Sequence, residues 1–379
     1  MNIVYIAPMF HTNQVPIVKG WVEHGDQVCF ICQYRGKTEN HDYCTPIVLG
    51  YSRLFLLINA VYKKICGRKK RLSAYPEAFQ DKCGFPPIFK LAKILKKQKP
   101  DLVVLRERSV YCIFACMVCR IHRIKCILYN QTPLWDDKPP RNDLAHRIVK
   151  RLTPSTRMTP VLGDSATGYL DPDAVYVPFV IEPHLAPAQK KFYADGTIRL
   201  LCVGKFEERK HHLMLLEILT HLLPEYPISL TLVGEASTPH HESYLKKVRE
   251  YINVHHLEAQ VHIHTNCKPD QMADFYRNAD LFVLPSTGEF ASVSQLEAMS
   301  YSLPVIVSDT NGTACYVENS KNGYLFRDKD IADLEAKITD MLRDLDRLKQ
   351  MGARSYELVQ TKYVFSNYMD KLKQMSQEK

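Results

Sequence analysis

Residues 284–307 read LPSTGEFASVSQLEAMSYSLPVIV, and this stretch gives the strongest indication of the fold. An apolar strand runs into a loop of small residues, a helix begins near Ser292, and Pro304 opens the next strand. Glu289 lies in the loop and Glu297 lies more than one turn inside the helix, so we expect the two carboxylates to contact different groups. The simpler alternative is a first-turn glutamate favoured by the helix dipole and a second glutamate on the surface.

A second motif, LCVGKFEERK at residues 201–210, also follows a predicted strand. The strand ends at Gly204, which lets the backbone approach a ligand, and Lys205, Arg209 and Lys210 follow it. Cations beside the start of a helix suit a pyrophosphate, which the free N–H groups of a helix N-terminus also favour. The alternative is a pair of solvent-facing basic residues in a loop.

Short apolar strands alternate with longer segments of helical period along the whole chain, which is typical of parallel α/β sheets. The strands expected before residue 183 are 3–6, 28–32, 102–105, 126–129 and 174–177, and those after residue 196 are 198–203, 229–233, 260–264, 281–284 and 305–307. We therefore predict two doubly wound, Rossmann-like lobes that face a central cleft, where a ligand would bind at the carboxyl ends of strands.

The expected boundaries follow from this alternation. Residues 1–182 form a first lobe, the polar and proline-containing residues 183–196 a linker, and residues 197–360 a second lobe. Residues 361–379 form a charged helix that is expected to pack back on the first lobe.

Length and composition limit the class of protein. A chain of 379 residues favours two lobes, and 46% hydrophobic with 24% charged residues excludes a mostly disordered chain. The longest apolar segments, such as residues 54–61, fall short of the ~20 residues that cross a bilayer. Met1 leads directly into an apolar strand, so we expect no secretion signal.

Most of the twelve cysteines lie in apolar runs, where a reduced thiol behaves as a small hydrophobic group, and a reducing cytoplasm fits this pattern. Cys112, Cys116 and Cys119 have the spacing of an iron–sulfur motif, but apolar residues separate them as on a buried helix. Cys29 and Cys32 have no second pair at zinc-like spacing, and we expect no metal site.

The formal net charge of +9 is concentrated in two basic runs. One follows the apolar residues 54–61 at once and extends to Arg71, and the other occupies residues 90–99. An apolar segment followed by a basic cluster indicates an interfacial helix, so residues 54–71 and 90–99 predict peripheral contact with an anionic membrane, and we expect no nucleic acid as partner. The alternative is a solvated charged face.

Together the motifs resemble family 4 of the retaining glycosyltransferases, which have the GT-B fold. Glu289 and Glu297 match the E-x7-E signature of that family, and 203–210 resembles its glycine, arginine and lysine phosphate-binding stretch. Further matches in order and spacing are Gly234, the run 280–286, the strand 303–306 and the run 322–325. The resemblance is strong across residues 198–326 and only general across the first lobe.

The resemblance implies a role for each matching residue. Glu289 would contact hydroxyls of the donor sugar and support charge at the reacting carbon, and Glu297 would hold the nucleotide ribose. Lys205 and Lys210 would neutralise the pyrophosphate leaving group with the amides of Ser292 and Val293 nearby, and residues 262–268 would pack against the base. Family members usually need no bound metal, and the resemblance implies no cofactor besides a UDP- or GDP-sugar donor.

The chain also departs from the family. Lys205 stands where arginine is common, so a bidentate fork becomes a point charge. Many members carry a histidine after a first-lobe strand, where this chain has Asn130 and Gln131, and an amide cannot relay a proton. Either amide would hydrogen-bond a sugar. His11, in the opening loop of the first lobe, is a further candidate to line the cleft.

We therefore expect a cytoplasmic, retaining, metal-independent hexosyltransferase that moves a sugar from a nucleoside-diphosphate sugar to a saccharide acceptor. If the basic runs contact a membrane, the acceptor is lipid-linked, as in the synthesis of a bacterial capsule, O-antigen or exopolysaccharide. Two alternatives stay open: a GT-B protein that binds a nucleotide sugar or a partner without turnover, and a sugar-nucleotide epimerase.

Overall fold

A computed structural model describes residues 1–36, 41–68, 76–107, 109–139 and 144–377 of the chain. The chain divides into two compact units. Unit 1 comprises Met1–Val180 together with Phe365–Lys379, and unit 2 comprises Ile181–Val364. Residues 183–196, which the sequence predicts as a linker, lie within unit 2.

Unit 1 is built on a parallel sheet of seven strands, with short apolar strands at its centre. In sheet order the strands are β3 (Ile47–Val48), β2 (Gln27–Cys32), β1 (Asn2–Ala7), β4 (Leu102–Arg106), β5 (Lys125–Tyr129), β7 (Arg157–Thr159) and β9 (Ala174–Tyr176). A separate antiparallel pair joins β6 (Trp135–Asp136) to β8 (Tyr169–Leu170).

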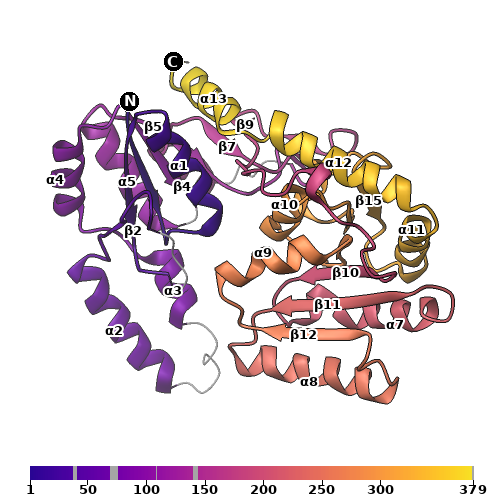
Figure 1. Cartoon of the computed structure of the whole chain (residues 1–379). Helices are drawn as coiled ribbons and strands as arrows, with labels where there is room; N and C mark the ends of the chain where they lie inside the picture. The colour runs from indigo at the N-terminus through magenta and orange to yellow at the C-terminus, as the bar shows by residue number, and fades with distance from the viewer. Residues whose placement is uncertain (37–40, 69–75, 108, 140–143, 378–379) are drawn as a thin grey trace. The chain divides into compact units, whose positions relative to one another are not determined.

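The helices of unit 1 connect these strands (Figure 1). They are α1 (Val15–Glu23), α2 (Arg53–Arg68), α3 (Pro76–Cys83), α4 (Ile88–Gln98), α5 (Val110–Ile121), α6 (Leu144–Leu152) and α13 (Phe365–Gln377), with the 3-10 turn η1 at Thr12–Gln14.

Successive residues of β1 enter opposite cores, as the alternation of side chains along a strand requires. Ile3 and Tyr5 face a core that α1 and α13 cover, whereas Val4 and Ile6 face a core that α4 and α5 cover. Helix α13 completes the first of these cores with Tyr368, Leu372 and Met375. Both faces of the sheet are therefore covered by helices, as a parallel sheet requires.

Unit 2 has a parallel sheet of six strands. In sheet order they are β12 (Val261–Thr265), β11 (Ile228–Gly234), β10 (Ile198–Val203), β13 (Leu281–Leu284), β14 (Val305–Ser308) and β15 (Gly323–Phe326). The helices are α7 (His212–Leu222), α8 (Pro239–Val254), α9 (Pro269–Asn278), α10 (Val293–Ser300), α11 (Ile331–Arg343) and α12 (Leu345–Thr361), with 3-10 turns η2 (Pro187–Gln189), η3 (Glu208–Lys210) and η4 (Gly312–Tyr316).

The predicted fold class is confirmed, because each unit is an α/β layer structure around one parallel sheet. Five of the described strands were not predicted: β3, β6, β7, β8 and β15. They have between two and four residues, too few to show a clear apolar period. Among the helices that the structure describes, none is both long enough and apolar enough to cross a membrane.

Candidate functional site

The end of β10 and the start of α7 form a tight loop in unit 2. The amide of Gly204 donates to the carbonyl of Val233 at the end of β11. A Cβ on Gly234 would lie 2.0 Å from the Gly204 oxygen, so glycine at this position lets the two strand ends approach each other. A Cβ on Gly204 would lie 3.2 Å from the Lys210 side chain, which folds over the loop and is buried.

Glu289 carries the charge contacts that define the site. Its carboxylate forms an ion pair with the Lys210 ammonium, and the Arg209 guanidinium donates to the same oxygen at 2.7 Å. Burial alone would raise the pKa of Glu289, but the two neighbouring cations outweigh it and hold the pKa below its ordinary value. Glu289 is therefore an anion at neutral pH.

The loop that carries Glu289 is fixed by backbone contacts. Gly288 adopts a left-handed conformation with φ of 58°, and the Gly312 amide donates to the Glu289 carbonyl at 2.7 Å. A Cβ on Gly312 would lie 1.9 Å from the Phe290 oxygen, so only glycine lets this loop pack against η4.

The helix predicted near Ser292 begins at Val293, and Ser292 is its N-cap. The Ser292 hydroxyl accepts from the Gln295 amide at 3.4 Å. Ser294 donates its hydroxyl to the Val203 carbonyl at 3.2 Å, which ties the start of α10 to the end of β10. The first-turn amides of α10 therefore lie beside the glycine-bearing loop, and amides at this position have no acceptor inside their own helix.

Glu297 has a different environment from Glu289. It is half-buried on α10, and the Tyr276 hydroxyl of α9 donates to its carboxylate at 2.7 Å. Burial raises the pKa of Glu297, and the Tyr276 hydrogen bond only partly opposes that shift. Tyr276 could not be predicted from the sequence, because its contact with Glu297 depends on how α9 packs.

The structure does not bring Lys205 and Lys210 to one partner. Lys205 is half-exposed and pairs with Glu235 at 3.2 Å, whereas Lys210 is buried against Glu289. Arg209 bridges two acids, because it also contacts Glu207 at 2.6 Å. In unit 2 the predicted catalytic glutamate and two of the three predicted phosphate-binding cations thus form one cluster.

In unit 1, Asn130 and Gln131 already take part in hydrogen bonds. Asn130 donates to Glu107 at 3.2 Å. The Gln131 side chain accepts from Arg106 at 2.7 Å and donates to the Tyr129 hydroxyl at 3.2 Å. These contacts place Gln131 beside two residues of the cavity described next. Neither amide replaces the proton relay that a histidine would give.

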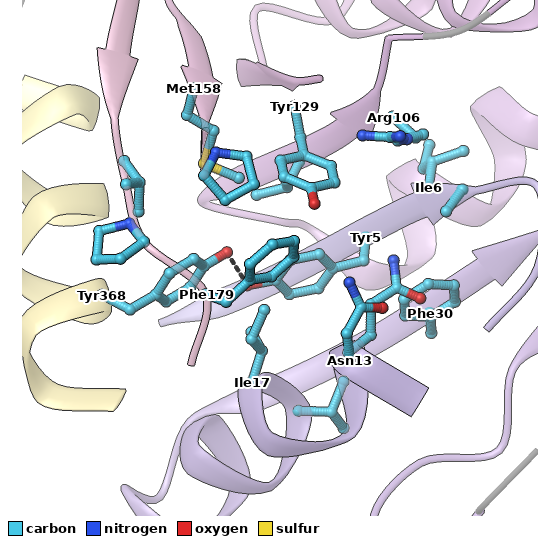
Figure 2. A pocket seen from close by; sticks show the side chains of 17 residues that line it. Tyr5, Ile6, Asn13, Ile17, Phe30, Arg106, Tyr129, Met158, Phe179 and Tyr368 are labelled. Carbon is cyan, nitrogen blue, oxygen red and sulfur yellow. Dashed lines mark hydrogen bonds between the residues drawn. The ribbon is translucent and has the colours of Figure 1, made fainter. Parts of the chain in front are cut away.

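A cavity lies at the carboxyl ends of the unit 1 strands (Figure 2). It offers about 40 Å³ to the centres of water-sized groups, which is room for a few waters. Figure 2 shows the aromatic rings of Tyr5, Phe30, Tyr129, Phe179 and Tyr368 around it.

The polar wall of this cavity is supplied by Asn13, Gln14 and Arg106. His11, which the sequence predicted to line a ligand site, is exposed and is not part of this wall. Its backbone amide instead caps η1 by donating to Gln14 at 2.8 Å. That His11 lines the cleft between the lobes stays a prediction.

Among the residues that the structure describes, no group of three or more His, Cys, Asp or Glu side chains could hold a metal ion. Cys112, Cys116 and Cys119 are buried in the core between α4, α5 and the sheet. Burial raises the pKa of Cys119 to about 12, which is the behaviour of an inert core thiol.

Comparison with known proteins gives a family match in unit 2. Residues 188–358 match the family model of Glycosyl transferases group 1. A D-inositol 3-phosphate glycosyltransferase of Streptomyces bingchenggensis is 28% identical over 203 residues, covering 48% of this chain and 43% of the relative. A lipopolysaccharide 1,2-N-acetylglucosaminetransferase of Salmonella typhimurium is 31% identical over 189 residues, covering 46% of each.

A D-inositol 3-phosphate glycosyltransferase of Nocardia farcinica is 33% identical over 87 residues, covering 23% of this chain and 19% of the relative. The chain thus matches less than half the length of each of these three curated relatives.

Solved structures match over the whole length. Anabaena HepE in complex with UDP and glucose superimposes with a TM-score of 0.70 at 14% identity, covering 100% of both chains. A glycosyltransferase from Rickettsia africae gives 0.69 at 13% identity, covering 99% of this chain and 97% of the other. The protein thus has the GT-B fold. With the family match in unit 2, it is a GT-B protein like those of glycosyltransferase family 4.

Proposed function

We propose that the protein is a retaining, metal-independent glycosyltransferase that uses a UDP- or GDP-sugar. The single observation that carries this proposal is the cluster of Glu289, Lys210 and Arg209 at the strand ends of unit 2. It combines an anion that supports positive charge at a sugar carbon with cations that neutralise a leaving diphosphate.

In this proposal the diphosphate of the donor takes up the charge of Lys210 and Arg209. The amides of Ser292 and Val293, at the start of α10, add hydrogen-bond donors on the same side of the loop. Lys205 is half-exposed and contributes from the periphery. Because two side-chain cations and a helix N-terminus can offset the diphosphate charge, the proposal needs no metal ion for the leaving group.

The two glutamates then have separate tasks. Glu289 faces the donor sugar, where its carboxylate accepts hydroxyl hydrogen bonds and stabilises the developing charge of the transition state. Glu297 binds the ribose, because one of its oxygens accepts from Tyr276 and its remaining acceptor sites suit hydroxyl groups. The leaving diphosphate departs with its charge held by the cations.

We assign the acceptor to the strand ends of unit 1 around the cavity, which itself has room only for a few waters. Its aromatic rings and the side chains of Asn13, Gln14 and Arg106 are the combination that binds sugar rings and their hydroxyls. The proposal extends to an acceptor in bacterial surface polysaccharide synthesis. It is supported by the relative from Salmonella typhimurium, which is a lipopolysaccharide 1,2-N-acetylglucosaminetransferase.

We also propose that residues 54–71 and 90–99 contact an anionic membrane, so that the acceptor is lipid-linked. The support is the excess of Lys and Arg in both segments. The reaction would then take place at the inner, cytoplasmic face of the membrane. The cysteines that the structure describes are free thiols, which fits a reducing compartment.

A panel of nucleotide sugars tests the donor. A donor that binds only the folded state raises the midpoint of thermal unfolding by mass action. We expect one UDP- or GDP-sugar to do so, and we expect it to be consumed with an oligosaccharide or lipid-linked acceptor. Transfer by Glu289→Ala at the wild-type rate would contradict the proposed mechanism.

A second candidate function is binding of a nucleotide sugar without turnover. The observation in its favour is that Asn130 and Gln131, which stand where the family resemblance predicts a histidine, are engaged in hydrogen bonds and cannot relay a proton. Tight donor binding with no transfer to any acceptor of the panel would favour this candidate over the enzyme.

A further inference from the structure

Among its described side chains, helix α2 in unit 1 packs a narrow stripe against α3. Phe55 and Asn59 are buried, and Asn59 donates to Gln80 of α3 at 3.1 Å. The Tyr62 ring stacks on Phe79 of α3 with centroids 3.9 Å apart. These residues recur at helical spacing, so they form the inner face of α2.

The outer face of α2 is apolar as well, which is unusual for a helix at a protein surface. Leu57 is 67% exposed and Leu54 is 60% exposed. Five exposed apolar residues recur at helical spacing along this outer face. They are Leu54, Leu57, Ile58, Val61 and Ile65, and we call them the outer stripe. A continuous exposed apolar surface marks a binding face.

A second apolar group lies close to the start of this stripe. The Ser52 amide, just before α2, donates to the Phe85 carbonyl at 2.9 Å, and Phe85 lies three residues before α4. Phe89, in the first turn of α4, is 93% exposed. The beginnings of the two helices therefore present apolar side chains from neighbouring points of unit 1.

The charge around these helices selects the occupant. Residues 53–99 contain 13 Lys and Arg but only 2 Asp and Glu, whereas the rest of the chain contains 37 and 39. The whole positive excess of the protein is therefore in this one segment. The cores of protein–protein interfaces are poor in lysine, whereas helices that lie in a lipid interface combine an apolar face with lysine and arginine.

We infer that α2 inserts its outer stripe, together with Phe89, into the interface of an anionic membrane. This deepens the membrane contact proposed above, because the charges alone would hold the protein only at the surface. Lys63, Lys64 and the lysines of α4 stay at the headgroups, where their long stems allow the ammonium groups to reach anionic phosphates.

Binding to vesicles tests the insertion and needs no turnover, so it is independent of whether sugar transfer is found. We expect the full chain to sediment with vesicles of phosphatidylglycerol and phosphatidylcholine, and much less with phosphatidylcholine alone. Leu57→Gln with Val61→Gln should weaken binding about tenfold. The matched control Ile121→Gln, which replaces a residue of unit 1 that is 72% exposed and far from the stripe in sequence, should bind as the wild type does.

A tryptophan at the stripe reports depth. Fluorescence of Leu57→Trp should shift to the blue on anionic vesicles and become shielded from a soluble quencher, and Ile121→Trp should not change. A bound protein whose Leu57→Trp emission is unchanged would leave only a surface contact and overturn the insertion. Absence of vesicle binding, or a self-association in solution that Leu57→Gln abolishes, would overturn it as well.

His211 follows Lys210 directly and is the N-cap of α7. Its φ of 51° and ψ of 38° lie in the left-handed region, where glycine is favoured. A side chain that occupies such a conformation needs contacts that hold it there.

The His211 side chain joins two loops of the site. Its Nε2 lies 2.6 Å from the Thr287 Oγ1, and the Thr287 hydroxyl donates to Asp328 at 2.7 Å. Because the one hydroxyl hydrogen of Thr287 goes to Asp328, the His211 ring is the donor in the first contact. The Thr287 amide also donates to the Arg209 carbonyl at 2.9 Å. Thr287 is two residues before Glu289.

The geometry points to His211 as a positioning residue that keeps the cation loop in register with the Glu289 loop. This rests on the proposed function. When a diphosphate takes up Lys210 and Arg209, their ion pairs with Glu289 weaken, and the His211–Thr287–Asp328 chain still connects the two loops. It acts through those residues and does not itself touch the donor.

A mutant cycle tests this with UDP and GDP as probes, and with uridine and guanosine as the matched ligands without phosphate. His211→Gly keeps the left-handed backbone and removes the ring, and Thr287→Val removes the hydroxyl. Each should weaken affinity for the diphosphate about tenfold and leave nucleoside affinity unchanged. The double variant should be no weaker than either single one, and Thr287→Ser should restore binding.

Effects that multiply in the double variant, or equal losses for the nucleoside and the diphosphate, would show that His211 does not act through Thr287. Failure of the wild type to bind either diphosphate would overturn this inference and the proposed function together. Diphosphate binding with the expected cycle but no sugar transfer would remove the proposed enzyme and keep the role of His211.

Discussion

The strand ends of unit 2 and those of unit 1 hold opposite kinds of chemistry. In unit 2 the side chains of Lys210 and Arg209 meet the Glu289 carboxylate, and glycines shape the loops around them. In unit 1 the corresponding cavity is aromatic, with Arg106 as its one charged lining residue among those that the structure describes. A charged site suits a diphosphate and an aromatic one suits a sugar ring, so in the proposed function the same type of sheet serves two ligands through different loops.

The largest expected effect follows removal of the Glu289 carboxylate in unit 2. We expect Glu289→Gln to lower kcat about 10²- to 10³-fold, because a neutral amide cannot stabilise positive charge at the sugar carbon. Initial rates with saturating donor measure this. Glu258→Gln, at an exposed position of unit 2, is the matched control and should retain the wild-type rate.

Removing a cation should change both rate and pH dependence. Lys210→Met keeps the packing over Gly204 but loses the charge, so kcat/KM should fall about 100-fold. Lys210 helps to hold the pKa of Glu289 low, so its loss raises that pKa. The acid limb of the rate profile should therefore move to higher pH.

Lys205→Met is the control for this pH effect. Lys205 is half-exposed and contacts Glu235 instead of Glu289, so we expect a loss of about fivefold or less and an unmoved acid limb. An identical shift of the acid limb in both variants would argue against a specific Lys210–Glu289 pair.

A substitution in the cavity of unit 1 should affect the acceptor and leave the donor unaffected. Asn13→Ala removes one polar group of the wall, and we expect the acceptor KM to rise about fivefold, as for one lost hydrogen bond, with an unchanged donor KM. The exposed neighbour Thr12→Ala is the control. A change in donor KM alone would remove the assignment of the two ligands to two units.

The smallest expected effect concerns stability. Burial raises the pKa of Glu297, so the folded state loses stability as pH rises from the ordinary carboxyl range through the raised value. Glu297→Gln removes this penalty and still accepts from Tyr276. We expect the midpoint of thermal unfolding to rise by about 1 to 3 °C at pH 7 but not at pH 4, while donor affinity falls.

The contrast between the units also explains what the sequence could predict. Glu289 and Glu297 lie within one short segment, so their spacing was visible along the chain. The contact of Glu289 with Lys210 was not, because it depends on the approach of two strand ends that are far apart in sequence. Lys210 was expected to neutralise a diphosphate, whereas in the structure it forms an ion pair with Glu289.

The cavity of unit 1 was harder to predict from the sequence, for a physical reason. It takes single residues from several strands, from the loop after β1 and from α13, so no short motif contains them. Asn13 and Gln14 were not singled out in the sequence, because the nearby His11 carries more distinctive chemistry. The strands β3 and β7 were missed because tertiary pairing with β2 and β5 stabilises segments too short to show a period.

Helix α13 affects the order in which the two units can fold during synthesis on the ribosome. Tyr368, Leu372 and Met375 belong to the core of unit 1, although all of unit 2 is translated before them. Trp21, whose ring lies 5.0 Å from that of Phe365, has no such contact until residue 365 of the 379 has been synthesised. Unit 2 can thus finish folding first, against the usual order in which the N-terminal domain is completed before the next.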